Sequence, residues 1–219
     1  MNFSAIRLIH IACISLAATF VTADAVAQDE DPVISIGGGL NFYHPTNDNG
    51  HPSMGFEVVY PWHGFETRWG PTFCFDSHAT DFDHTLGGLN APLGSLSMQV
   101  LVVGYGYKRY FGQVSAEANM SGGYSFNNFS VASDAGSRFA TAGVSLVGVD
   151  VDNGWVLRPD VSVSYDVLRL VAVGVSAAYL VARPHETITT FAGNQRRRLN
   201  ADQFELSAEV TVGVGKTKQ

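Results

Sequence analysis

Apolar and polar residues alternate along most of the chain beyond its first thirty residues. In residues 33–43 the even positions include Ile34, Ile36, Leu40 and Phe42, whereas the odd positions are mostly serine, glycine and asparagine. The same period of two recurs in five further segments, namely residues 53–60, 65–76, 113–126, 155–166 and 203–214. Because successive side chains of a strand point to opposite faces, this pattern predicts β-strands with one apolar face.

Three less regular segments are also predicted to be strands: residues 95–107, 138–151 and 169–182. The last is almost wholly apolar, but it is rich in valine and shorter than the roughly 20 residues that a membrane-spanning helix needs. The segments together give an odd number of strands, which cannot close an antiparallel sheet with both termini on one side. Residues 187–191 could extend the preceding strand or form a strand of their own.

Short connections are expected at residues 61–64 and at Asp152–Gly154, where an Asn-Gly pair favours a hairpin turn. Neither an internal repeat nor a linker divides the chain. We therefore predict an all-β fold, a single antiparallel up-and-down β-barrel of roughly eight to ten strands that occupies residues 28–219.

Residues 1–27 are predicted to be a cleaved signal peptide. Arg7 precedes an apolar run over residues 8–21, and the small-residue triplet Ala25-Val26-Ala27 provides a cleavage site. The exported chain would begin at or near Gln28. It would keep Cys74 as its single thiol, so it could form no internal disulfide in an oxidising compartment.

Aromatic side chains gather near the ends of the predicted strands, as in the interfacial girdles of membrane barrels. They are Tyr60, Trp62, Phe65, Tyr105, Tyr107, Tyr110, Phe111, Tyr124, Phe126, Trp155, Tyr165 and Tyr179. The opposite face mixes small residues with charges of both signs, which suits the narrow lumen of a small barrel. The candidate inward-facing residues are Glu57, Glu66, Arg68, Glu117, Arg158, Asp160, Glu205 and Glu209. The alternative is a soluble periplasmic barrel whose apolar face forms its core and binds an apolar ligand.

The charge distribution argues against nucleic acid as a partner. The chain has a formal net charge of −7, and only 15% of its residues are charged. One basic run, Arg196-Arg197-Arg198, follows Gly193 and Asn194 and is typical of a solvated loop. A functional alternative for this run is contact with the phosphate groups of a glycolipid.

Candidate chemistry is confined to polar loops. Histidines and carboxylates crowd two predicted loops, with His44, Asp48 and His51 in the first and Asp76, His78, Asp81, Asp83 and His84 in the second. Zinc accepts such ligands, but the spacings follow no known metal-binding pattern.

Two further patterns resemble catalytic or cofactor motifs. His51-Pro52-Ser53 has the His-x-Ser spacing of outer-membrane lipid A deacylases, although the residues that follow the serine in that family are missing. Gly37-Gly38-Gly39 lacks the Lys-Ser/Thr of a phosphate-binding loop. We therefore assign no catalytic, cofactor-binding or metal-binding residue and expect no cofactor.

With this alternation and these aromatic positions, residues 33–215 resemble the small outer-membrane β-barrel proteins, a group that includes the transmembrane domain of outer membrane protein A and its eight-stranded relatives. The resemblance implies a monomeric barrel in the outer membrane, with lipid around it and a possible surface ligand at its loops. It favours a non-enzymatic protein with a structural, adhesive or surface-binding role. A small pore and a lipid-modifying enzyme are the alternatives.

Overall fold

The computed structural model describes residues 32–61, 69–168 and 170–215. These ranges do not include the predicted signal peptide, nor Trp62, Phe65, Glu66 and Arg68. The turn expected at residues 61–64 lies outside them except for Pro61. The elements in chain order are β1 (Pro32–Pro45), β2 (Ser53–Pro61), β3 (Trp69–Leu86), β4 (Leu89–Phe111), β5 (Val114–Val131), α2 (Ala135–Thr141), β6 (Leu146–Val151), β7 (Gly154–Leu168), β8 (Val171–Ala182), β9 (His185–Thr190), β10 (Gly193–Arg198) and β11 (Gln203–Gly215). Among the described helical residues, no segment is long and apolar enough to cross a bilayer.

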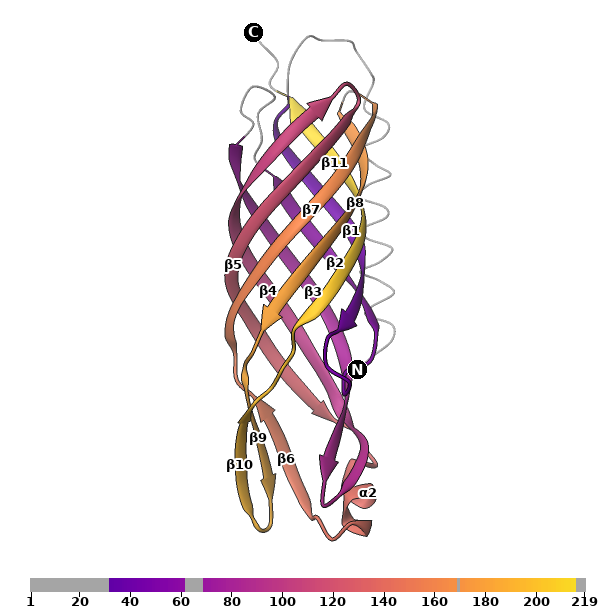
Figure 1. Cartoon of the computed structure of the whole chain (residues 1–219), viewed down its shortest axis with the longest axis vertical. Helices are drawn as coiled ribbons and strands as arrows, with labels where there is room; N and C mark the ends of the chain where they lie inside the picture. The colour runs from indigo at the N-terminus through magenta and orange to yellow at the C-terminus, as the bar shows by residue number, and fades with distance from the viewer. Residues whose placement is uncertain (1–31, 62–68, 169, 216–219) are drawn as a thin grey trace. The chain divides into compact units, whose positions relative to one another are not determined.

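Eight of the strands close into an antiparallel barrel (Figure 1). Their order around the barrel is β1-β11-β8-β7-β5-β4-β3-β2, and β2 returns to β1. The pairing of β1 with β11, for example Gly38 with Val210, closes the sheet between the two ends of the chain. The predicted all-β fold and the single antiparallel barrel are confirmed.

The stagger of the strands fixes the width of the barrel. The chain of paired residues that starts at Trp155 runs once around the barrel and returns to β7 at Tyr165, ten residues further on. Eight strands with such a stagger are tilted by roughly 40–45° and enclose a lumen just wide enough for side chains. Most lumen positions must therefore be filled by small residues or by side chains that pair with one another.

The apolar face of the strands points out of the barrel, as the sequence predicts. On β11, Phe204, Leu206 and Val210 are exposed, whereas the intervening Glu205 and Ser207 are buried in the lumen. A soluble barrel would show the reverse arrangement. The exterior is thus an apolar surface that suits contact with lipid tails.

Aromatic rings bound this apolar surface at two levels. We call Tyr124, Phe126 and Trp155 the outer ring, since Tyr124 contacts both partners at 5.4 and 5.5 Å between ring centroids. Trp69 packs with Tyr105 and Tyr107 at the other end of the barrel. From Trp155 to Tyr165 the strand β7 advances by ten residues, which is about 33 Å along the strand. At a tilt of about 40–45° this corresponds to roughly 25 Å along the barrel axis, which matches the apolar band of a transmembrane barrel.

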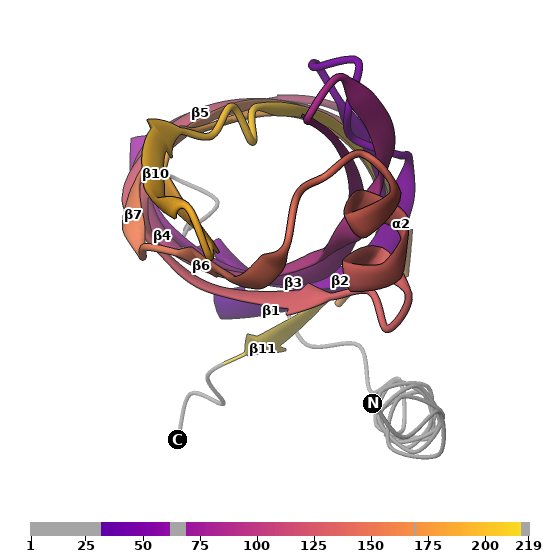
Figure 2. The same cartoon turned by 90° about the horizontal axis from the view of Figure 1, so that it is seen from below.

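The connections at one end of the barrel fold into an ordered structure that we call the loop domain. It consists of a three-stranded sheet in the order β10-β9-β6, the helix α2 and the tip of the β3–β4 hairpin (Figure 2). These parts share an apolar core of their own, made by Leu86, Ala91, Leu93, Ala135, Phe139 and Ile188. The loop domain is therefore held by burial as well as by its attachment to the strands.

Three local predictions from the sequence are wrong in whole or in part. Residues 138–151 form the end of α2, a turn and β6, because Ala135 and Phe139 are buried on one side of a helical turn. The predicted loop from Asp76 to His84 is part of β3. Asp152–Gly154 joins β6 to β7, which pair with different strands, so it does not form a hairpin turn.

The structure also settles the open question about residues 187–191. All but the last fall in β9, a strand of the loop domain and outside the barrel. The even strand number required for closure is thus met by the eight barrel strands alone.

Candidate functional site

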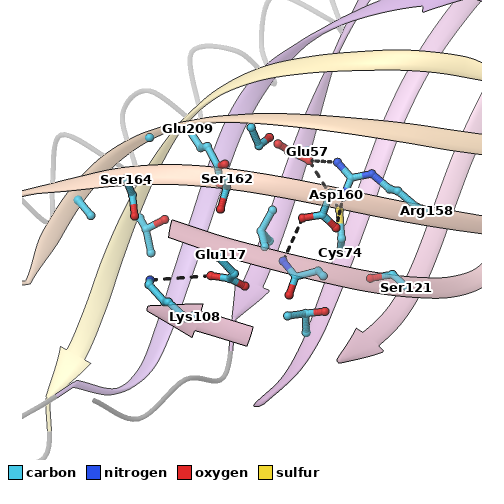
Figure 3. Close-up of a pocket in the computed structure, with 17 residues that line it drawn as sticks. Glu57, Cys74, Lys108, Glu117, Ser121, Arg158, Asp160, Ser162, Ser164 and Glu209 are labelled. Carbon is cyan, nitrogen blue, oxygen red and sulfur yellow. Dashed lines mark hydrogen bonds and ion pairs between the residues drawn. The ribbon is translucent and has the colours of Figure 1, made fainter. Parts of the chain in front are cut away.

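A buried cluster of charges crosses the lumen near the outer ring. Arg158 of β7 contacts Glu57 of β2 at 2.9 Å and Glu205 of β11 at 2.8 Å, and Asp160 lies 3.8 Å away. The two glutamates and the arginine are almost completely buried. We call these four residues the Arg158 cluster; Figure 3 shows Glu57 and Asp160 beside the guanidinium of Arg158. The sequence correctly predicted that all four face inward.

A hydrogen-bond network continues from this cluster toward the loop domain. The hydroxyl of Tyr43 donates to Asp76, and Asn41 donates to Tyr43 at 2.9 Å. The ring of Tyr43 stacks on His78 with 4.0 Å between the centroids, and His78 contacts the amide of Gln203. Side chains from β1, β3 and β11 therefore meet across the lumen.

Apolar side chains line the lumen beside and beyond these polar groups. On β4, Met98, Val100 and Val102 point inward and are buried, although Leu101 and Val103 on the same strand face outward. The sequence predicted a polar inner face throughout, and for β4 this prediction is wrong. On this strand the inward and the outward side chains are both mainly apolar. The sequence therefore shows no alternation from which the inner face could be identified.

A small polar cavity lies on the other side of the Arg158 cluster. Its volume is about 60 Å³, and Lys108, Glu117, Ser162, Ser164 and Glu209 are among the side chains that line it (Figure 3). Lys108 lies 3.9 Å from Glu117. The predicted inward residues Glu117 and Glu209 thus face this cavity, which contains small hydroxyl groups and charges of both signs.

The histidines and carboxylates of the two predicted loops do not gather into one site. Asp76 and His78 face the lumen, His84 contacts Arg197, and His51 pairs with Asp83 at 3.2 Å. Within the described part of the chain, no three histidine, cysteine, aspartate or glutamate side chains are arranged to hold a metal ion. The two segments meet at His51 and Asp83, but Asp76, His78 and His84 lie apart from this pair because the second segment is part of the strand β3.

The other two motifs have structural explanations. Ser53 shares a hydrogen bond of 3.0 Å with Thr80, whereas His51 is directed to Asp83, so the pair shows no Ser-His contact. Gly39 lies in β1, where an added Cβ would come within 2.7 Å of the Ser207 hydroxyl. Glycine is required at this position by the close approach of β11 in the narrow lumen.

Arg197 joins the loop domain to the barrel strands. Its guanidinium donates to Glu186 of β9 at 2.8 Å and to Nδ1 of His84 of β3 at 2.6 Å. His84 lies in the part of β3 that reaches the loop domain, three residues before Gly87. Burial and then the charge of Arg197 lower the pKa of His84, while Glu186 opposes this effect.

Known structures share this architecture. No protein-family profile matches the chain, and no curated protein matches it. The crystal structure of the outer membrane protein OprG from Pseudomonas aeruginosa is similar with a TM-score of 0.72, 10% sequence identity, and coverage of 85% of this chain and 98% of that chain. The outer membrane protein AlkL, determined by solid-state NMR in lipid bilayers, is similar with a TM-score of 0.55, 12% identity, and coverage of 90% and 99%.

The chain has the fold of the small outer-membrane β-barrel proteins. The resemblance predicted from the sequence is therefore confirmed at the level of fold. An outer-membrane location is supported by this fold together with the apolar exterior between two aromatic levels.

The Arg158 cluster leads to a prediction about stability. Arg158→Ala should lower the free energy of unfolding by about 3–5 kcal/mol, because it leaves Glu57 and Glu205 buried without their cation. A triple variant with Arg158→Met, Glu57→Gln and Glu205→Gln should recover most of this loss. Lys108→Ala, at a longer and partly exposed pair, serves as the control and should cost less than about 1 kcal/mol. Urea unfolding in lipid vesicles measures all three, and an unchanged midpoint for Arg158→Ala would show that water solvates the two glutamates.

His84 leads to a prediction about pH. Folding lowers its pKa, so the folded loop domain binds fewer protons than the unfolded chain near the usual histidine pKa of about 6.5. The contribution of His84 to stability is thus fully present above about pH 6.5 and decreases as the pH falls, until the folded protein also protonates. Amide hydrogen exchange of β9 and β10 should accelerate between pH 7.5 and 5.5, after correction for intrinsic rates. In His84→Gln this acceleration should disappear; its persistence would assign the pH dependence to another group.

Proposed function

We propose that the protein is a surface-binding protein of the outer membrane, in which the barrel is the anchor and the loop domain makes the contacts. The observation that carries this proposal is the ordered loop domain with its own apolar core. Loops that only join strands need no shared core. A rigid platform beyond the outer ring reduces the entropy that would be lost when a partner binds.

An apolar tip on this platform is suited to contact a partner. Phe191, between β9 and β10, is 88% exposed, and Val147 at the bulge of β6 is 58% exposed. The backbone of Phe191 is tied to the segment before β6, since its N–H donates to the carbonyl of Ser145 at 3.2 Å. An exposed aromatic residue suits a protein interface, where aromatic side chains are enriched.

The state of the lumen favours an anchor over a pore. The Arg158 cluster and the Tyr43 network connect opposite walls, and apolar side chains such as Leu96 and Leu180 fill the lumen nearer the loops. An ion would have to separate buried charge pairs before it could pass, which is costly. The polar cavity lies on the far side of the cluster from the loops, so we interpret it as a recess and not as part of a continuous channel.

The remaining alternatives have less support. A lipid-modifying enzyme would need Ser53 beside a base, but Ser53 hydrogen-bonds to Thr80 while His51 pairs with Asp83. A soluble barrel with an apolar core would place residues such as Leu206 and Val163 inside, whereas both are about half exposed.

The proposal predicts a closed barrel that binds through its tip. The wild-type protein in planar bilayers should show no steady channel conductance. Cells that display it should adhere to some members of a panel of immobilised extracellular proteins and glycans, relative to cells without it. Phe191→Ser combined with Val147→Ser should abolish this adhesion, while Ala140→Ser on the exposed side of α2 should leave it unchanged.

Two results would contradict the proposal. Regular single-channel openings in the wild-type protein would favour a pore. Equal adhesion of the wild type and the tip variant, at equal surface levels, would show that the tip makes no productive contact.

A further inference from the structure

We propose that Arg183 and Arg198 form a binding site for the phosphate groups of the glycolipid in the outer leaflet. This inference rests on the proposed placement of the barrel in an outer membrane. It concerns the side of the loop domain next to the bilayer, which is a different surface from the apolar tip.

The strand register separates the three consecutive arginines of β10. Arg197 pairs across the sheet with Glu186, and both point toward His84 and the core of the loop domain. Arg198 lies opposite His185 on the other face, where both side chains are exposed. Arg198 therefore points away from the core while Arg197 has a structural role.

Both arginines of the proposed site lie just beyond the outer ring. Arg183 directly follows Ala182, the last residue of β8, which pairs with Val156 of β7. The neighbour of Val156 in the outer ring is Trp155, which is 81% exposed. Aromatic rings of this kind mark the level of lipid headgroups, so a side chain one residue further out is at the level of phosphate groups.

Arg198 is held near Arg183 but keeps donors free. Its Nε donates to the backbone carbonyl of Arg183 at 3.3 Å. Asp202 accepts bonds from Nε and Nη2 of Arg183 at 3.0 and 2.8 Å. Among the described residues, no carboxylate lies within ion-pair distance of Arg198. Both terminal nitrogens of Arg198 and Nη1 of Arg183 are thus available to an incoming anion.

The surrounding charges leave the unpaired positive charge of β10 at its end nearest the bilayer. Arg196 pairs with Asp152 at 2.7 Å, and Asp150 lies two strands away in the same register. The Asp152 carboxylate offsets the charge of Arg196, as Asp202 offsets that of Arg183. The positive charge that remains is that of Arg198, on a chain whose net charge is −7.

Arginine is well matched to phosphate in this setting. Its planar guanidinium can donate two parallel hydrogen bonds to a phosphate, and such charge-assisted bonds are stronger than neutral ones. A phosphorylated glycolipid would supply acyl chains for the apolar exterior and phosphates for the arginines at once. We therefore propose a lipid headgroup as the ligand of this site. The test must exclude binding of free phosphate.

The test measures lipid binding by the full-length exported chain in maltoside micelles, which contain no phosphate. A bis-phosphorylated lipid A is the probe, and the same lipid with its phosphates removed is its control. Removal of one charge-assisted contact should weaken binding about tenfold, so Arg198→Gln should raise Kd by about that factor and Arg198→Glu by more. The matched control is Arg138→Gln on α2, also an exposed arginine, which should bind as the wild type does.

Each arm of the experiment gives a distinct outcome. Equal binding of the dephosphorylated lipid, or equal weakening by Arg138→Gln, would overturn the proposal in favour of general adsorption. Competition by inorganic phosphate at the same concentration as the lipid would assign the site to free phosphate. Failure of the wild type to insert into vesicles would contradict the outer-membrane placement itself, whereas insertion without an effect of Arg198→Gln would contradict this site alone. Unfolding curves of the Arg198 variants should match that of the wild type, because Asp202 keeps Arg183 as its partner in each.

Discussion

Closure of the sheet is the constraint on which the rest of this structure depends. The interior of a bilayer offers no hydrogen-bond partner to an open strand edge, so every backbone group must pair within the protein. The contact between β1 and β11 removes the last edges, and an eight-stranded barrel with this stagger has little space inside. Apolar side chains can then face lipid, but each charged side chain in the lumen needs a partner.

The Arg158 cluster follows from this lack of space. Glu57 and Glu205 come from strands far apart in the chain, and one arginine from β7 contacts both. The same contacts connect three sides of the barrel. Beyond the filled lumen lies the loop domain, whose sheet, helix and hairpin tip pack on one another. The loop domain offers an apolar tip and a basic margin near the bilayer as two separate surfaces.

The sequence correctly predicted the strands that have a polar environment on one face and an apolar environment on the other. In β11 the alternation identified both the lipid-facing residues and Glu205 in the lumen. It failed where the two faces meet similar surroundings. Residues 76–84 of β3 are mostly polar on both faces, and Met98 to Val102 of β4 are mostly apolar on both. The short helix α2 and the sheet of β6, β9 and β10 depend on contacts between segments far apart in the chain, which no local pattern reveals.

The candidate sites were likewise predictable from the sequence only in part. Inward positions such as Arg158 and Glu205 followed from alternation, but their pairing needed the register of all eight strands. Likewise, the run Arg196-Arg197-Arg198 was visible as a basic segment, while its separation into an inward Arg197 and an outward Arg198 needed the pairing of β9 with β10.

The central claim is that the apolar face of each barrel strand contacts lipid while the polar face fills a closed lumen. A nitroxide scan along β11 in lipid vesicles tests it most directly, with single labels at positions 204 to 210 and Cys74 replaced by serine. Labels at Phe204, Leu206, Ala208 and Val210 should relax strongly with dissolved oxygen, which partitions into lipid, whereas labels at Glu205, Ser207 and Glu209 should be shielded. Uniform shielding of the even positions, with the odd positions open to water-soluble reagents, would contradict the membrane barrel described above.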